Sequence, residues 1–371
     1  MRPEITEGQL RSQLTRIALD IRPKNIINGS PDEPELVHEY GYNDDGVYSS
    51  RIKIYLRSNG CVSATCTMCP MPHETSYGND ALITSDNYLR QFDYAFKNRT
   101  IDDYDIVCVY NSGNWFVDRE ISPEARRGIY STVAKSKSKA MMVQSLPQFI
   151  TPKAIDEAKI ILGDKKLIVG IGLQSATDVV RNLCVNTTCT KPQFERATEL
   201  LVENGYVPET YLMIKPPFLT ESEAIQDTVD SVKYLDSLGL TNASICPTRI
   251  SPHTVAFELA KRDLYEPPSL WTVVDILKVL RQEGVRIRVA CLDIDGKDDN
   301  TMYPNGCETC SPKILDVLRR YNISGDASTL DTLSCDKCEA QHNTRLEEHY
   351  DSPFEERVNN FIQTYTEELS L

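Results

Sequence analysis

The stretch Arg57-Ser-Asn-Gly-Cys-Val-Ser-Ala-Thr-Cys-Thr-Met-Cys-Pro70 carries three closely spaced cysteines, Cys61, Cys66 and Cys69. It directly follows the strand-like run at residues 51–56. Three thiolates in one tight loop can hold three irons of a 4Fe-4S cluster, which leaves the fourth iron open to a small molecule. The triplet therefore predicts a reactive site immediately after a strand.

An incomplete zinc site is the alternative interpretation of this triplet. Structural zinc takes four Cys or His ligands, and His73 is the only obvious fourth ligand nearby. The position of the triplet after a strand of an α/β chain favours the iron–sulfur cluster.

The composition is typical of a large cytoplasmic protein. The chain has 371 residues, of which 40% are hydrophobic and 25% charged, enough for a deep core with a smaller appended part. No apolar run is long enough to span a membrane, and the N-terminus lacks the features of a signal peptide. Most of the 12 cysteines fall in short-range pairs or triplets, which favours metal ligation over disulfides. The net charge of -14 argues against an extensive basic nucleic-acid face but allows a local one.

The chain alternates between strand-like and helix-like segments. Apolar runs predict strands at residues 52–56, 106–110, 140–144, 167–173, 209–214, 243–246 and 286–291. Amphipathic stretches, each followed by glycine, predict helices at residues 192–204, 221–237 and 270–282. This alternation predicts an α/β fold with a parallel sheet, in the form of a partial (β/α)6-type barrel.

Polar segments follow several of these strands. They are Asn111–Asn114, Gln174 with Ser175, and Lys215 in a Lys-Pro-Pro sequence. In a parallel α/β fold the loops after the strands meet at one rim, so the segments are expected to share a site with the cysteine triplet. For Lys215 a contact with a carboxylate or phosphate competes with a simple role in ending the strand.

Across residues 50–350 the chain resembles radical S-adenosylmethionine (SAM) enzymes, and within them the archaeosine-biosynthesis proteins related to the catalytic subunit of Elongator. The resemblance rests on a series of motifs in the same order: the Cys-x4-Cys-x2-Cys triplet, Ile-Gly-Leu-Gln-Ser at 171–175, Tyr-Leu-Met-Ile-Lys-Pro-Pro at 211–217, Tyr-Glu-Pro-Pro-Ser-Leu-Trp at 265–271, and the pairs Cys307/Cys310 and Cys335/Cys338.

This resemblance implies a function and a set of site residues. Cys61, Cys66 and Cys69 would ligate a 4Fe-4S cluster whose fourth iron binds SAM, and reductive cleavage of SAM would give a 5'-deoxyadenosyl radical. The implied cofactor-binding residues are Met68, Asn111, Ser112, Gly113, Asn114, Gln174, Ser175 and Lys215. The implied partners are an electron donor such as flavodoxin or ferredoxin, tRNA or a nucleoside-like small molecule, and a transferase.

The sequence leaves more than one substrate and function open. The nearest family implies a lyase acting on a modified 7-deazaguanine in tRNA. The sequence departs from the family pattern at Gln144-Ser-Leu-Pro147, at Val185-Asn-Thr-Thr188 and at Pro304-Asn-Gly-Cys307, where charged groups or a histidine are expected. A radical SAM enzyme acting on a free nucleoside, sugar or other metabolite is therefore an alternative. A metal-stabilised RNA-binding or scaffold protein without catalysis is a second one, disfavoured by the intact triplet.

The two late Cys-x2-Cys pairs predict a second metal site. Cys307, Cys310, Cys335 and Cys338 suit tetrahedral zinc, with an auxiliary iron–sulfur cluster as the alternative. The predicted organisation is an N-terminal extension at 1–50, a radical SAM barrel at 51–290, a cysteine-rich region at 291–345 and a C-terminal helix at 346–371.

Overall fold

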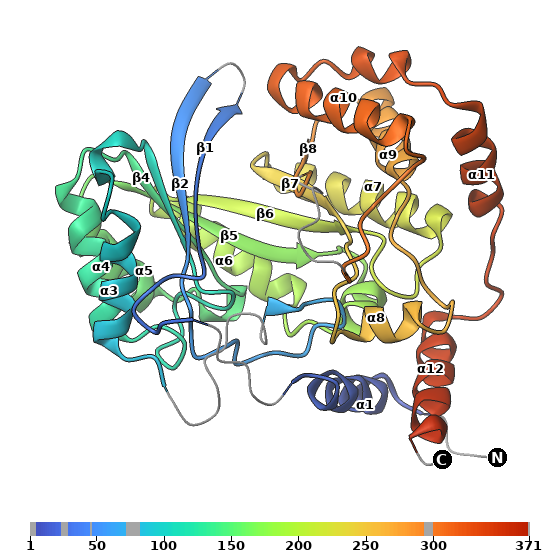
Figure 1. Cartoon of the computed structure of the whole chain (residues 1–371), viewed down its shortest axis with the longest axis horizontal. Coiled ribbons are helices and arrows are strands. Elements are labelled where there is room, and N and C mark those ends of the chain that lie inside the picture. The colour runs from blue at the N-terminus through green and yellow to red at the C-terminus, as the bar shows by residue number, and fades with distance from the viewer. Residues whose placement is uncertain (1–4, 24–28, 45–46, 72–81, 293–299, 370–371) are drawn as a thin grey trace.

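The computed structural model describes residues 5–23, 29–44, 47–71, 82–292 and 300–369. At its centre is an eight-stranded sheet whose strands lie in chain order from β1 to β8 (Figure 1). β1 pairs antiparallel with β2, whereas all neighbours from β2 to β8 are parallel. The strands are β1 Leu36–Asp44, β2 Val47–Tyr55, β3 Ile106–Tyr110, β4 Ala140–Gln144, β5 Lys166–Gln174, β6 Val207–Ile214, β7 Ala243–Pro247 and β8 Arg288–Val289.

Helices connect the successive parallel strands, as parallel pairing requires. They are α3 Ser85–Ala95, α4 Pro123–Lys135, α5 Pro152–Leu162, α6 Lys191–Glu203, α7 Glu221–Ser237, α8 Val255–Ala260 and α9 Leu270–Gln282. Thr84, Thr190 and Thr220 each begin one of these helices with a capping box, in which the threonine and the residue three positions later satisfy each other's free N–H groups.

The two faces of the sheet differ in character because alternate side chains of a strand point to opposite sides. Ile52 and Ile54 of β2 are fully buried in the main apolar core, which the connecting helices also line. Arg51, Lys53 and Tyr55 of the same strand point to the other, inner face. The inner face is therefore polar and aromatic where the outer face is apolar.

The sheet is curled, so that its first and last strands approach each other. The ring of Tyr42 on β1 lies between two guanidinium groups, with Arg51 3.5 Å and Arg288 4.1 Å from the ring centroid. Arg288 belongs to β8, so this contact links the two ends of the sheet at the amino ends of the parallel strands. The result is an open barrel (Figure 1).

The predicted α/β half-barrel is confirmed, and each predicted strand and helix overlaps an observed one. Strand β1 was not predicted. Its sequence, Leu-Val-His-Glu-Tyr-Gly-Tyr-Asn-Asp, lacks the apolar run of a buried strand because it lies at the sheet edge, paired on one side only. Strand β8 is shorter than predicted, with two residues in place of the run at 286–291.

A second apolar core joins the two ends of the chain. Helices α1 Glu7–Asp20 and α12 Phe354–Glu368 pack with α8 and with a short π-helix, Val180–Cys184, that follows β5. Figure 1 shows α1 and α12 side by side below the carboxyl ends of the strands. The N-terminal and C-terminal helices therefore close the same side of the barrel.

The cysteine-rich region packs into the main core. Helix α10 Cys310–Ser324 contributes Ile314 and Leu318, both fully buried in the core that α9 shares. Helix α11 Asp336–Leu346 is tied to α9 by a 2.8 Å contact between His342 Nε2 and Asp275 Oδ2. The described part of this region from residue 300 to residue 345 thus extends the barrel core.

Candidate active site and metal centre

Cys61, Cys66 and Cys69 lie in the loop after β2, and all three are partly exposed. Two N–H groups approach the sulfur of Cys61: the backbone amide of Ala64 at 3.5 Å and the side-chain amide of Asn114 at 3.6 Å. Ala64 has a φ of +40°, which an L-residue rarely adopts, so the turn between Cys61 and Cys66 is tight. Burial raises the pKa of the Cys61 thiol, and the hydrogen bonds from Ala64 and Asn114 offset part of the rise. The thiolate is the form that binds iron.

The cysteine loop is fastened to the segment after β5. Thr65 Oγ1 donates to the carbonyl of Asn186 over 2.8 Å, and Asn186 Nδ2 donates back to the carbonyl of Thr65 over 3.0 Å. The backbone N–H of Thr67 donates to Val185 O over 3.0 Å, and its hydroxyl to Cys184 O over 2.5 Å. Contacts distant in sequence therefore hold the loop in place.

A buried carboxylate, Glu120, joins the cysteine loop to the loop after β3. Its oxygens accept hydrogen bonds from the backbone N–H of Val62 (2.9 Å) and from the side-chain amides of Asn114 (2.7 Å) and Asn111 (3.3 Å). The backbone N–H of Asn114 is a further donor. Burial raises the pKa of this carboxyl, and the hydrogen bonds offset part of the rise. No sequence pattern marks Glu120, since a single acid in a turn has no periodicity.

The loop after β3 presents two buried polar atoms that have no partner among the described residues. They are Oδ1 of Asn111, a residue only 1% exposed, and Oγ of Ser112, whose φ is +54°. Gly113 follows, and a Cβ there would stand 2.0 Å from an oxygen of Glu120, so only glycine fits. Buried polar atoms are almost always satisfied in proteins, so unsatisfied ones at this rim indicate a ligand site.

Asn114, by contrast, is fully used within the protein. Besides its bonds to Glu120 and Cys61, its Oδ1 accepts from the backbone N–H of Leu146 over 2.8 Å. Its role is to join the loops after β2, β3 and β4.

Gln174 and Ser175, at the end of β5, also differ in how their side chains are placed. The pairing of β5 with β6 shifts register between Gly172 and Gln174, and Gln174 has a φ of +69°. Such a bulge re-aims a side chain, and here the amide folds over Gly172, where a Cβ would be 2.4 Å from its nitrogen. Ser175 is buried and donates to Asp227 Oδ1 over 2.7 Å, so its hydroxyl is already paired.

Lys215 and Met68 point into the protein. The Lys215 ammonium lies 2.9 Å from Glu221 Oε1, and both side chains are at most 5% exposed. Thr272 Oγ1 and the backbone N–H of Ser269 also donate to Glu221. The charge of Lys215 is therefore matched inside the core. Met68 packs, partly buried, against the core that joins α1 and α12.

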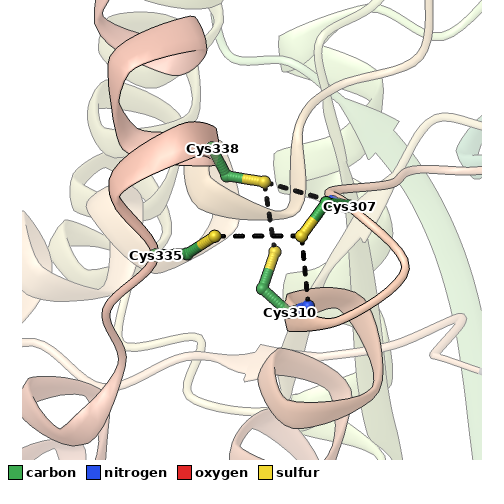
Figure 2. A group of neighbouring side chains, drawn as sticks. All are labelled: Cys307, Cys310, Cys335 and Cys338. Atoms are coloured by element: carbon green, nitrogen blue, oxygen red, sulfur yellow. Dashed lines mark hydrogen bonds between the residues drawn. The ribbon is translucent and has the colours of Figure 1, made fainter.

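The four late cysteines form a compact group (Figure 2). Their sulfurs all lie within 4.8 Å of one another, with Cys307 and Cys335 at 3.8 Å and Cys310 and Cys338 at 3.3 Å. Four bonds of about 2.3 Å to one tetrahedral ion would place sulfurs about 3.8 Å apart. The residues therefore fit a single metal ion.

The surroundings of this group shift the pKa values of its thiols in opposite directions and leave little room for a side chain at residue 306. Hydrogen bonding by the backbone N–H of Cys310 and by Cys338 lowers the pKa of Cys307 to about 6, whereas burial raises the pKa of Cys338 to about 12. A Cβ at Gly306 would stand 2.8 Å from the sulfur of Cys310, so glycine is required beside the group. A bound cation would favour the ionised form of every cysteine.

The first triplet differs from this group. Among the described residues, the four late cysteines have ligand atoms close enough together to share one metal ion, and Cys61, Cys66 and Cys69 do not form such a group. His73, the alternative zinc ligand, lies outside the described residues.

No family model matches the chain, but individual proteins and solved structures are similar to it. It is 30% identical over 311 residues to an uncharacterized protein of Methanocaldococcus jannaschii, covering 81% of this chain and 82% of that protein. It is 24% identical over 332 residues to the archaeosine synthase subunit beta of Methanosarcina acetivorans, and the match covers 87% of this chain and 93% of that protein. The structure of methylornithine synthase matches with a TM-score of 0.50 and 12% identity, covering 87% of this chain and 81% of that one.

The chain belongs to one family with the Methanocaldococcus protein, and it shares the fold of methylornithine synthase. At this rim the loop after β2 supplies three thiols, and the loop after β3 supplies two buried polar atoms that have no partner among the described residues. Among the described residues, no helix is long and apolar enough to cross a membrane.

The buried pair of Lys215 and Glu221 leads to a prediction about stability. Glu221→Gln keeps the shape but leaves the Lys215 ammonium without a counter-charge in the core, and we expect a loss of about 3–5 kcal/mol in the free energy of unfolding. Urea denaturation measures it. The control is Glu266→Gln, which breaks the exposed pair with Arg345 and should cost no more than about 1 kcal/mol. Equal effects of both substitutions would contradict the assignment.

Proposed function

We propose that the chain is a radical SAM enzyme in which Cys61, Cys66 and Cys69 ligate the 4Fe-4S cluster and the loops after β3 and β5 bind SAM. The observation that carries the proposal is a pair of buried atoms, Asn111 Oδ1 and Ser112 Oγ, that find no partner in the described structure. They lie in the loop that Glu120 joins to the cysteine triplet. When bound, the cluster and SAM would supply reductive cleavage of the sulfonium and hydrogen abstraction from a substrate.

The residues divide into binding and positioning groups. Asn111 Oδ1 and Ser112 Oγ are acceptors suited to the ammonium of the methionine moiety. The Gln174 amide, which the bulge brings over Gly172, suits the ribose hydroxyls. Asn114 and Ser175 would act through the loops they hold. Neutral amides add no positive charge beside a cationic sulfonium, which a lysine or arginine would do.

The proposed reaction is the lyase step of archaeosine formation, on a modified 7-deazaguanine in tRNA. Two relatives are named archaeosine synthase subunit beta, which also supports a partner subunit, such as a transferase. The inner face of the sheet carries tyrosines that suit a planar base, with Tyr55 and Tyr110 having ring centroids 5.3 Å apart. The net charge of -14 favours the second candidate, a free nucleoside-like metabolite. Flavodoxin or ferredoxin is the proposed electron donor.

Replacing Cys66 tests the catalytic assignment. We expect Cys66→Ala to remove the visible absorbance of the cluster and all formation of 5'-deoxyadenosine, because two thiolates cannot hold the three irons. The fold should remain, since the loop lies at the barrel rim and not in the core. Anaerobic reconstitution, iron analysis and circular dichroism measure these outcomes, and a full iron load in the variant would refute the assignment.

The same preparations test the substrate. The wild type should convert tRNA carrying the lysine-modified 7-deazaguanine, and binding should weaken steeply as salt increases, because phosphate contacts release counterions. Absent or salt-insensitive tRNA binding, together with turnover of the free nucleoside, would support the small-molecule alternative.

Asn111→Ala tests the cofactor pocket. We expect it to keep the cluster but weaken SAM binding several-fold to about tenfold, because a lost hydrogen bond costs about 0.5–1.5 kcal/mol. Equilibrium binding to the reconstituted protein measures this. The control is Asn98→Ala, at an exposed position. Unchanged affinity at full iron content would mean that SAM binds elsewhere.

The four late cysteines are proposed to hold one tetrahedral ion, with zinc as the first choice and an auxiliary cluster as the alternative. The double substitution Cys335→Ser, Cys338→Ser should release this metal and destabilise the segment beyond Val289, because it removes half of the ligands. Metal analysis and proteolysis measure the two effects, with Cys291→Ser as the control. Unchanged metal content in the double variant would contradict the site.

A further inference from the structure

The N-terminal segment places an arginine, Arg22, against the cysteine loop. Arg22 follows the end of α1 at Asp20. The helix is fixed by its buried residues Leu10 and Leu14, and by Arg11, whose Nη2 donates to the carbonyl of Thr187 over 2.7 Å. The position of Arg22 is therefore set by the same segment after β5 that fastens the cysteine loop.

The guanidinium contacts the turn between the first two cysteines. Its Nη1 donates to the carbonyl of Ala64, the residue whose own N–H points at the sulfur of Cys61. Its Nε is buried and has no hydrogen-bond partner among the described residues. No carboxylate among the described residues forms an ion pair with Arg22. Within that part of the structure, the cation is thus held beside the loop without a counter-charge of its own.

The electrostatic neighbours of Arg22 are the three cysteines of the triplet. Burial lowers its pKa, whereas Cys69, Cys66 and Cys61 raise it, in that order. An arginine side chain remains protonated in proteins, so a permanent positive charge faces the sulfurs.

We propose that Arg22 tunes the reduction potential of the cluster by stabilising its reduced state. The inference rests on the proposed function of the triplet. In the reaction considered, a low-potential one-electron donor of the ferredoxin or flavodoxin class is oxidised and the cluster gains one electron, with no bond made or broken and no proton moved. The loop then carries one more negative charge, which a fixed, partly desolvated cation nearby favours. Arg22 is a positioning and tuning residue that needs no contact with substrate.

The test compares three variants of the full chain after anaerobic reconstitution. Arg22→Gln removes the charge, Arg22→Lys keeps it, and Arg16→Gln removes a charge from the exposed face of α1 as a control. Dithionite titration with redox mediators, followed by electron paramagnetic resonance, gives the midpoint potential beside the iron content. We expect Arg22→Gln to lower the equilibrium constant for reduction about tenfold, which is about 59 mV for one electron. Arg22→Lys and Arg16→Gln should stay near the wild type.

A wild-type potential in Arg22→Gln at full iron content would overturn the inference. So would an unchanged potential with weakened SAM binding, which would assign Arg22 to the carboxylate of the cofactor. If Arg22→Gln loses its iron, the Arg22→Lys variant decides the question. A full cluster at the wild-type potential in Arg22→Lys supports the role of the charge. Loss of iron in Arg22→Lys as well overturns the inference. A wild-type protein that binds no cluster would refute the triplet assignment itself, a result distinct from all of these.

Discussion

A single buried carboxylate, that of Glu120, joins the two loops on which the proposed site depends. It accepts hydrogen bonds from Val62 in the cysteine loop and from Asn111 and Asn114 in the loop after β3. A buried carboxylate is costly unless its oxygens are satisfied, so the donors must stay in place for the fold to tolerate it. This requirement fixes the two loops relative to each other.

The cysteine loop is short and has little apolar content, so it cannot hold its own shape. Thr65 and Thr67 hydrogen-bond it to the segment after β5, and Arg22 contacts it from the N-terminal side. The segment after β5 is in turn held by the core that α1 and α12 complete. Both ends of the chain therefore support the rim at which chemistry is proposed, although neither belongs to the parallel sheet.

The two sites obey different constraints. At the barrel rim, the thiols are partly exposed, and polar atoms such as Asn111 Oδ1 are left without a partner by the residues that the structure describes, which suits a ligand site. In the cysteine-rich region, four sulfurs crowd together beside Gly306 and against the main core, a geometry that closes around one ion. An open rim suits catalysis, whereas a closed tetrahedral site suits a structural metal.

The sequence by itself determined the class of fold, because apolar runs such as residues 106–110 and amphipathic runs such as 221–237 have local periodicities that identify strands and helices. It also indicated the two cysteine groups, since metal ligands recur at short, recognisable spacings. Only the tertiary structure showed that Lys215 is matched by Glu221, that Glu120 joins two loops, and that Arg22 faces the triplet. Each of these depends on contacts that the curled sheet and its packed helices create, and the sequence around a single charged residue does not reveal what will lie beside it after folding.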